Sequence, residues 1–179
     1  MLDCRIVYQE QDKKQGFFEI PAISYLNSLN TQAIVCSHDA QSVIYFVSDR
    51  KGGFGGLDIW LSVIDSDGKF GVPINAGGKI NSSSDEITPF YNKHDGMMYF
   101  SSNKRGGMGA FDIYKSSGRL NLWSESINVK HLNSSQDELY LTFYDEINGY
   151  FSSIEMGQNL TAKNIAVMTS LFLNIKKTF

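Results

Sequence analysis

The chain has 179 residues, of which 42% are hydrophobic and 20% are charged, so it is long and apolar enough to form a folded domain. Its net charge of −3 disfavours a nucleic-acid partner, because such a partner selects for a basic face. Aromatic residues make up 13% of the chain, and 16 glycines stand against 3 prolines, which favours strands joined by tight turns.

Residues 1–25 are predicted to form a partial unit of strands. No apolar run approaches the roughly 20 residues of a membrane-spanning helix, so no membrane insertion is expected. No signal peptide is visible either, which leaves a cytosolic protein or a chain that lacks its true beginning. Cys4 and Cys36 each lie in a strand-like run, and we expect buried free thiols, with a disulfide between them as the alternative.

The segments 26–79 and 80–131 repeat one another at an offset of 54 residues. SDRKGGFGGLDIW (48–60) recurs as SNKRGGMGAFDIY (102–114), and Asn27-Ser28 recurs as Asn81-Ser82. Segment 132–179 is a degenerate third copy, in which Asn133 and Asp137-Glu138 follow Asn81 and Asp85-Glu86 by 52 residues but the glycine-rich loop is missing. A fixed period of this size is typical of a repeat architecture.

Each period is predicted to contain four short strands. In the second copy these cover about Glu86–Asn92, Met97–Ser102, Phe111–Ser116 and Leu122–Val129. Hairpin turns are expected at Asp65–Gly68, Asp95-Gly96 and Asn148-Gly149, and NIAVM and LFLNI near the end are predicted as the last two strands. The predicted fold is therefore all-β, with four-stranded antiparallel blades of the β-propeller type. About three blades are present, which is fewer than the four or more of a closed ring and indicates a partial or fragmentary propeller.

The glycine-rich loop resembles a phosphate-binding loop, but strands flank it on both sides. A phosphate loop needs a helix to follow, so we expect no nucleotide and no other cofactor. We expect instead that Asp58 and Asp112 accept backbone N–H bonds from their loops. Arg50 and Arg105 are predicted to lie in solvated basic turns, and a contact with a binding partner is the alternative. The positions expected to build the repeat are Asn27, Gly52, Gly53, Gly55, Asp58, Trp60, Asn81, Asp85, Gly106, Gly107, Gly109, Asp112, Tyr114, Asn133 and Asp137.

INSSSDEITPFYNKHDGMMYFSSNKRGGMGAFDIY (80–114) resembles the WD-like propeller repeat of the TolB type. The good match covers about Leu26 to Ser153; the first copy departs from it at Thr31-Gln32, and the third lacks the glycine loop. The resemblance implies a protein-interaction scaffold in the periplasm or at the outer membrane of Bacteroidetes-like bacteria, where such repeats often accompany an OmpA-like domain. A homodimer of two copies that completes a six-bladed ring is a further hypothesis.

Catalysis is not expected. A prolyl-oligopeptidase-type enzyme would need G-x-S-x-G, which is absent from the sequence, and the Asp85-Glu86 and Asp137-Glu138 pairs recur at one blade position, which favours a structural role. His38, His94 and His131 lack the spacing of a metal site, and His38 and His94 are expected in the exposed turn before the second strand of their repeats. One residue of each pair Tyr45-Phe46, Tyr99-Phe100 and Tyr150-Phe151 is expected in the core between blades. The function predicted is non-enzymatic binding of a protein or a cell-wall component, and a carbohydrate-binding or carbohydrate-active propeller is the alternative.

Overall fold

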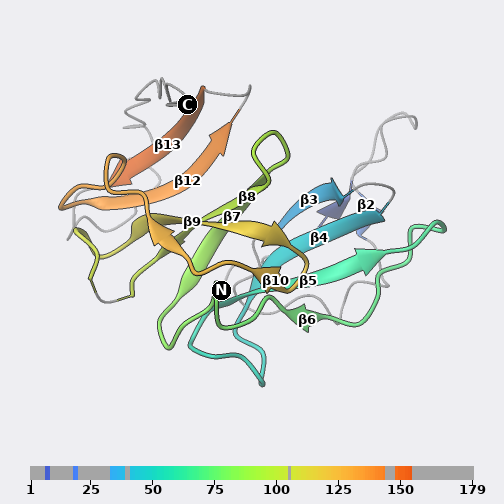
Figure 1. Cartoon of the computed structure of the whole chain (residues 1–179). Coiled ribbons are helices and arrows are strands. Elements are labelled where there is room, and N and C mark those ends of the chain that lie inside the picture. Colours follow the sequence, from blue (N-terminus) through green and yellow to red (C-terminus); the bar gives the residue numbers. More distant parts are fainter. Residues whose placement is uncertain are drawn as a thin grey trace.

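The computed structural model describes residues 7–8, 18–19, 33–38, 41–104, 106–143 and 148–154, and in these ranges the chain is all-β, as predicted. All neighbouring strands pair in the antiparallel sense. Figure 1 shows the sheets side by side, from the blue and teal strands of the first to the orange strands of the last. The described residues include no helix with the length and apolarity needed to cross a membrane.

The first sheet has four strands in chain order, each paired with the next. They are β3 (Ala33–His38), β4 (Gln41–Ser48), β5 (Asp58–Ile64) and β6 (Ile74–Asn75). The predicted hairpin at Asp65–Gly68 is confirmed: Gly68 N donates to the carbonyl of Asp65, and Gly68 has a φ of 76°. A separate pair of short strands, β1 (Val7–Tyr8) and β2 (Phe18–Glu19), lies within the predicted partial unit.

The second sheet repeats this arrangement. It contains β7 (Glu86–Asn92), β8 (Met97–Ser102), β9 (Asp112–Arg119), β10 (Leu122–Trp123) and β11 (Ile127–Asn128). The first two bounds agree with the prediction, and the hairpin at Asp95-Gly96 is confirmed.

The single strand predicted over Leu122–Val129 is wrong. The chain turns at Leu120, which has a φ of 57°, and β10 then pairs with the end of β9. After β10 the chain leaves the sheet in a bulge, and β11 pairs with residues closer to the beginning of β9.

The third sheet contains β12 (Asp137–Phe143) and β13 (Gly149–Ile154), which form a hairpin. The turn predicted at Asn148-Gly149 is wrong in position, because Gly149 already pairs with Phe143 as the first residue of β13. The strands predicted from NIAVM and LFLNI lie outside the described residues, as do the side chains of Cys4 and Cys36. In the described part of the chain the first sheet packs on the second and the second on the third, and these strands do not close a ring.

Two equivalent apolar layers separate the three sheets. Between the first and second sheets, Tyr45 packs edge-on against Trp123 at 5.9 Å between ring centroids, with Phe100 in the same cluster. Between the second and third sheets, Tyr99 occupies the place of Tyr45 and packs against Phe143 at 5.1 Å.

Both members of the first two aromatic pairs are buried, because alternate side chains of a strand point to opposite faces and both faces of these sheets are covered. One member of each pair was expected between blades. In the pair Tyr99-Phe100 both members lie between sheets, one on each side of the second sheet.

Candidate functional site

A buried carboxylate closes the first glycine-rich loop, which joins β4 to β5. Asp58, the first residue of β5, accepts hydrogen bonds from the backbone N–H groups of Phe54 (2.6 Å) and Gly55 (3.1 Å). Its third donor is the side-chain amide of Asn75 on β6, at 2.8 Å. The expected bonds from the loop to Asp58 are confirmed, and the anion that this loop holds is the protein's own carboxylate.

The second loop, between β8 and β9, repeats these contacts atom for atom. Asp112 accepts hydrogen bonds from Met108 N (2.6 Å), Gly109 N (2.9 Å) and Asn128 Nδ2 (2.8 Å). In both repeats a strand follows the loop, so no helix N-terminus faces it. A phosphate would have to displace a buried carboxylate to reach these N–H groups, so the two loops are not built as phosphate-binding loops.

Each loop is also fastened to the repeat that follows it. Asp85 accepts a hydrogen bond from Leu57 N at 2.9 Å, and Glu86 N donates to the carbonyl of Leu57 at 2.7 Å. The next junction repeats both bonds, from Phe111 N to Asp137 (2.9 Å) and from Glu138 N to Phe111 O (2.8 Å), and adds one from Ala110 N to Asp137 (3.1 Å). The Asp-Glu pairs therefore join repeats, in agreement with the structural role preferred for them.

An asparagine side chain completes each junction. Asn81 accepts from Ile59 N at 2.8 Å and donates to Ile59 O at 2.9 Å, so its amide pairs with the backbone of β5 in the preceding repeat. Asn133 makes the same two bonds to Ile113 of β9, at 2.8 and 3.0 Å. Asn27, the corresponding residue of the first copy, lies outside the described residues.

Close packing explains the glycines at two positions of each loop. A Cβ at Gly55 would lie 2.1 Å from the carbonyl oxygen of Ser84, and one at Gly109 would lie 1.8 Å from that of Gln136. Cβ atoms at Gly53 and Gly107 would lie 2.4 Å from the carboxylates of Asp58 and Asp112, respectively. Only Gly52 and Gly106, with φ of 95° and 97°, require glycine for its backbone freedom.

Two glutamates lie entirely inside the junctions. Glu86 accepts hydrogen bonds from Ser82 N (2.7 Å), Ser82 Oγ (2.6 Å) and Ser102 Oγ (2.7 Å). Burial raises the pKa of Glu86, although these bonds and the charge of Lys104 act in the opposite direction. Glu138 repeats the arrangement with Ser134 and Ser153.

A cation lies over an aromatic pair in each of the first two repeats. Arg50 lies 4.8 Å from the ring centroid of Phe46 and 5.3 Å from that of Trp60, and its Nε donates to Ser48 Oγ at 2.8 Å. The predicted solvated turn is wrong for Arg50, since the guanidinium is half-buried and burial lowers its pKa, against the charge of Asp49.

In the second repeat Lys104 takes the place of Arg50, because its Nζ lies 3.9 Å from the ring centroid of Tyr114. The sequence prediction had paired Arg50 with Arg105, which lies outside the described residues. Burial lowers the pKa of Lys104, and the charge of Glu86 acts in the opposite direction.

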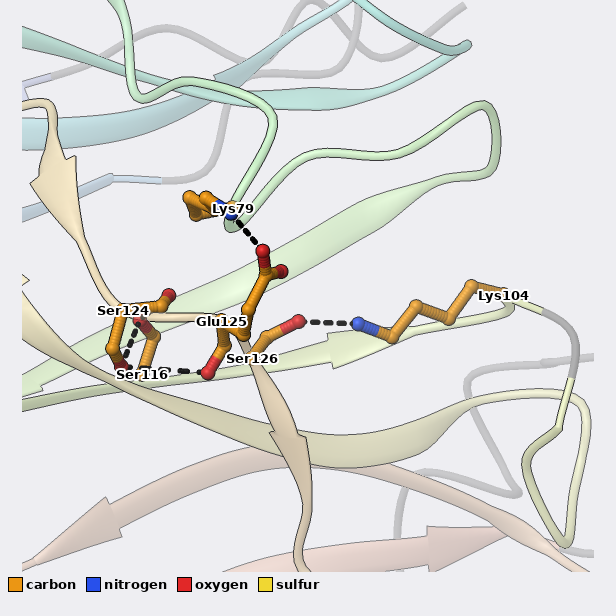
Figure 2. Close-up of polar contacts among 6 residues, drawn as sticks. All are labelled: Lys79, Lys104, Ser116, Ser124, Glu125 and Ser126. Carbon is orange, nitrogen blue, oxygen red and sulfur yellow. Dashed lines mark hydrogen bonds and ion pairs between the residues drawn. The ribbon is translucent and has the colours of Figure 1, made fainter.

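Figure 2 shows how the bulge between β10 and β11 is held. Lys104 Nζ donates to Ser126 Oγ at 2.5 Å, Ser116 Oγ donates to the carbonyl of Ser124 at 2.6 Å, and Lys79 forms an ion pair with Glu125. Lys79 belongs to the connection between the first and second sheets, so this bulge adds a third fastening at that junction.

The remaining predicted groups do not converge on a site. His94 is exposed in the turn between β7 and β8, as expected, and His131 is exposed as well. The turn predicted at His38 is wrong, because His38 is the last residue of β3 and pairs with Gln41; its side chain lies outside the described residues. Among the described residues, no three His, Cys, Asp or Glu side chains come together as metal ligands. Two buried donors, Trp60 Nε1 and Asn92 Nδ2, have no hydrogen-bond partner among the residues that the structure describes.

Sequence reasoning missed Asn75 and Asn128, which connect Asp58 to Asn81 and Asp112 to Asn133. The signal was the Ile-Asn pair at 74–75 and 127–128, which is offset by 53 residues rather than 54 and was therefore hidden from an ungapped comparison. No protein-family model, curated protein or solved structure matches the chain.

Proposed function

We propose that the chain is a non-enzymatic protein-interaction scaffold of the bacterial cell envelope, built from TolB-like propeller repeats. The observation that carries the proposal is that the recurring polar side chains form the same internal hydrogen bonds in two consecutive repeats. Asp58 and Asp112 are each 1% exposed, and each binds its own loop. The motif thus supplies rigid, equally spaced loops, a design suited to contact with another macromolecule.

The strand arrangement supports reading the sheets as blades. The first two sheets are antiparallel, and their short strands β6 and β11 pair at equivalent register, with Trp60 opposite Asn75 and Tyr114 opposite Asn128. The second sheet buries one face against the first sheet and the other against the third, as a propeller blade does. Light scattering tests the homodimeric ring proposed from the repeat number: a folded monomer at high concentration excludes it.

Covalent capture of partners in the envelope tests the scaffold proposal. A photo-crosslinking residue is placed at exposed surface positions in turn, in the native cells, and crosslinked products are identified in the periplasmic and membrane fractions. A defined heterologous partner, recovered from some positions and not from others, is the expected result. Recovery of this chain alone from every position, or its location in the cytosol, contradicts the proposal.

A carbohydrate partner is the second candidate, and one observation favours it. Tyr45 and Tyr99 are buried, but the third residue of the series, Tyr150, is 38% exposed, and Tyr140 on the adjacent strand is 55% exposed. Exposed aromatic rings can stack on sugar rings. Co-sedimentation with purified peptidoglycan tests this candidate, and binding that survives Tyr140→Ala and Tyr150→Ala would count against it.

A further inference from the structure

The third sheet exposes the face that the first two sheets use to pack on their neighbours. Tyr45 on β4 packs on the second sheet and Tyr99 on β8 packs on the third, and they are 0% and 4% exposed. Tyr150 on β13 takes the same place in its repeat but is 38% exposed. Phe151 packs toward the second sheet, so Tyr150 points to the opposite side of the strand. Figure 1 shows β12 and β13, in orange, at this end of the row of sheets.

The neighbouring positions on β12 show the same difference from the second sheet. Tyr140 and Thr88 lie in equivalent bulges, with φ of 58° and 51°, yet Tyr140 is 55% exposed and Thr88 only 7%. Thr142 follows the bulge and is exposed, whereas Phe90, at the same place on β7, is half-buried. In the part of the chain that the structure describes, no further sheet packs on this side of the third sheet.

This side of the third sheet is rich in aromatic rings and hydroxyl groups. We call it the tyrosine face, and its residues are Tyr140, Thr142, Tyr150 and Ser152. The charged residues of the two strands are Asp137 and Glu138, which begin β12 at the end away from Thr142 and accept hydrogen bonds at the junction with the second sheet. A two-fold contact places a surface patch against its own copy, and an uncharged patch can meet itself without repulsion.

The opposite end of the row has no comparable face. Ile44, Phe46 and Trp60 lie on the side of the first sheet that faces away from the second, and they are 1%, 0% and 7% exposed within a single chain. A head-to-tail contact, which a ring of two copies requires, would need these residues to be exposed. A contact between two third sheets needs only the tyrosine face.

We propose that two copies of the chain associate through their tyrosine faces, with the third sheets packed on each other about a two-fold axis. The rings of Tyr140 and Tyr150 supply the apolar contact, and the hydroxyl groups around them supply hydrogen bonds. The carbohydrate candidate concerns the same tyrosines, but Tyr45 and Tyr99, at the places equivalent to Tyr150, pack on protein sheets, which favours a protein occupant. The contact is separate from any heterologous partner, so it goes beyond the scaffold proposal and does not depend on it.

Sedimentation velocity of the full chain over a wide range of concentration measures the association. Wild type is expected to change from monomer to dimer as the concentration rises. Tyr140→Lys/Tyr150→Lys brings like charges together across the two-fold axis and is expected to raise the dissociation constant about tenfold or more. Circular dichroism checks that the variant is folded. The matched control, Val72→Lys/Leu122→Lys, adds the same charges at side chains that are 81% and 74% exposed in the first two repeats, and it is expected to dimerise like wild type.

A photo-crosslinking residue in place of Thr142 identifies what occupies the face. In a mixture of isotopically labelled and unlabelled protein, it is expected to join the third sheets of two copies. A monomer at every concentration, equal dimerisation of the tyrosine variant, or a crosslink to the first sheet, to another protein or to a glycan overturns the inference. A monomer that still captures a heterologous partner at another surface leaves the scaffold proposal intact.

Discussion

The carboxylate of Asp58 is expected to stabilise the first repeat by an amount that can be worked out from its three donors. In Asp58→Asn, the amide oxygen can keep the bonds from Phe54 N and Asn75 Nδ2, which both reach Oδ2, at 2.6 and 2.8 Å. The amide nitrogen then faces the N–H of Gly55, which donates to Oδ1 at 3.1 Å in wild type. Two donors would meet there, and no hydrogen bond could form.

The expected cost is about 2 kcal/mol in the free energy of unfolding. Loss of the charge weakens each of the two retained bonds by about 0.5 kcal/mol. The Gly55 N–H, left without an acceptor, adds about 1 kcal/mol, which is the low end of the range for such a group because Gly55 is exposed. For a chain of this size that lowers the midpoint of thermal unfolding by about 4–8 °C.

Urea unfolding followed by tryptophan fluorescence and circular dichroism measures the effect, with Asp67→Asn in the exposed Asp65–Gly68 turn as the matched control. If Asp58→Asn unfolds like that control, the carboxylate does not hold the loop and the argument fails.

Three further predictions concern the junctions between repeats. Gly109→Ala places a Cβ 1.8 Å from the carbonyl of Gln136 and is expected to cost about 3 kcal/mol or more, measured by urea unfolding, whereas Gly68→Ala, with φ of 76° and no atom within 4 Å, costs only about 1 kcal/mol of backbone strain. Burial raises the pKa of Glu86 in the folded state, so its contribution is greatest at low pH and is lost as the pH rises through that pKa. Wild type should therefore lose stability relative to Glu86→Gln as the pH rises above 4.5, the ordinary value for a glutamate, and a difference that does not change with pH would contradict this. Lys104→Met removes the contacts with Ser126 and the Tyr114 ring and is expected to cost about 1 kcal/mol in thermal unfolding, partly restored by Lys104→Arg; equal midpoints for all three proteins would refute it.

The sequence alone predicted the features that depend on local turn chemistry and on the alternation of apolar and polar residues. The Asp-Gly hairpin at 95–96, the strands Glu86–Asn92 and Met97–Ser102, and the capping by Asp58 follow from local turn chemistry and alternation, and all three are confirmed. The repeat at an offset of 54 residues also located the positions that join neighbouring units.

Contacts across a gap in the repeat were not predictable in the same way. Asn75 and Asn128 were overlooked because the offset changes to 53 residues at that point, after the bulge at Ser124–Ser126. Arg50 was assigned to the solvent because sequence spacing does not reveal that the strand turns its guanidinium over the rings of Phe46 and Trp60. Burial of this kind depends on neighbouring sheets and is not encoded in any local window.

The junction bonds imply that damage to one repeat should loosen the loop of the repeat before it. Asp85 lies in the second repeat but accepts its hydrogen bond from Leu57 in the first, whereas Asp137 in the third accepts its bonds from Ala110 and Phe111 in the second. In native-state hydrogen exchange, Asp85→Ala is therefore expected to reduce protection of the Leu57 amide by about tenfold and to leave the Phe111 amide unchanged. Asp137→Ala should have the opposite pattern and serves as the matched control. Equal loss at both amides in either variant would mean that the repeats open together, and the loops would then depend on global stability rather than on the carboxylate of the next unit.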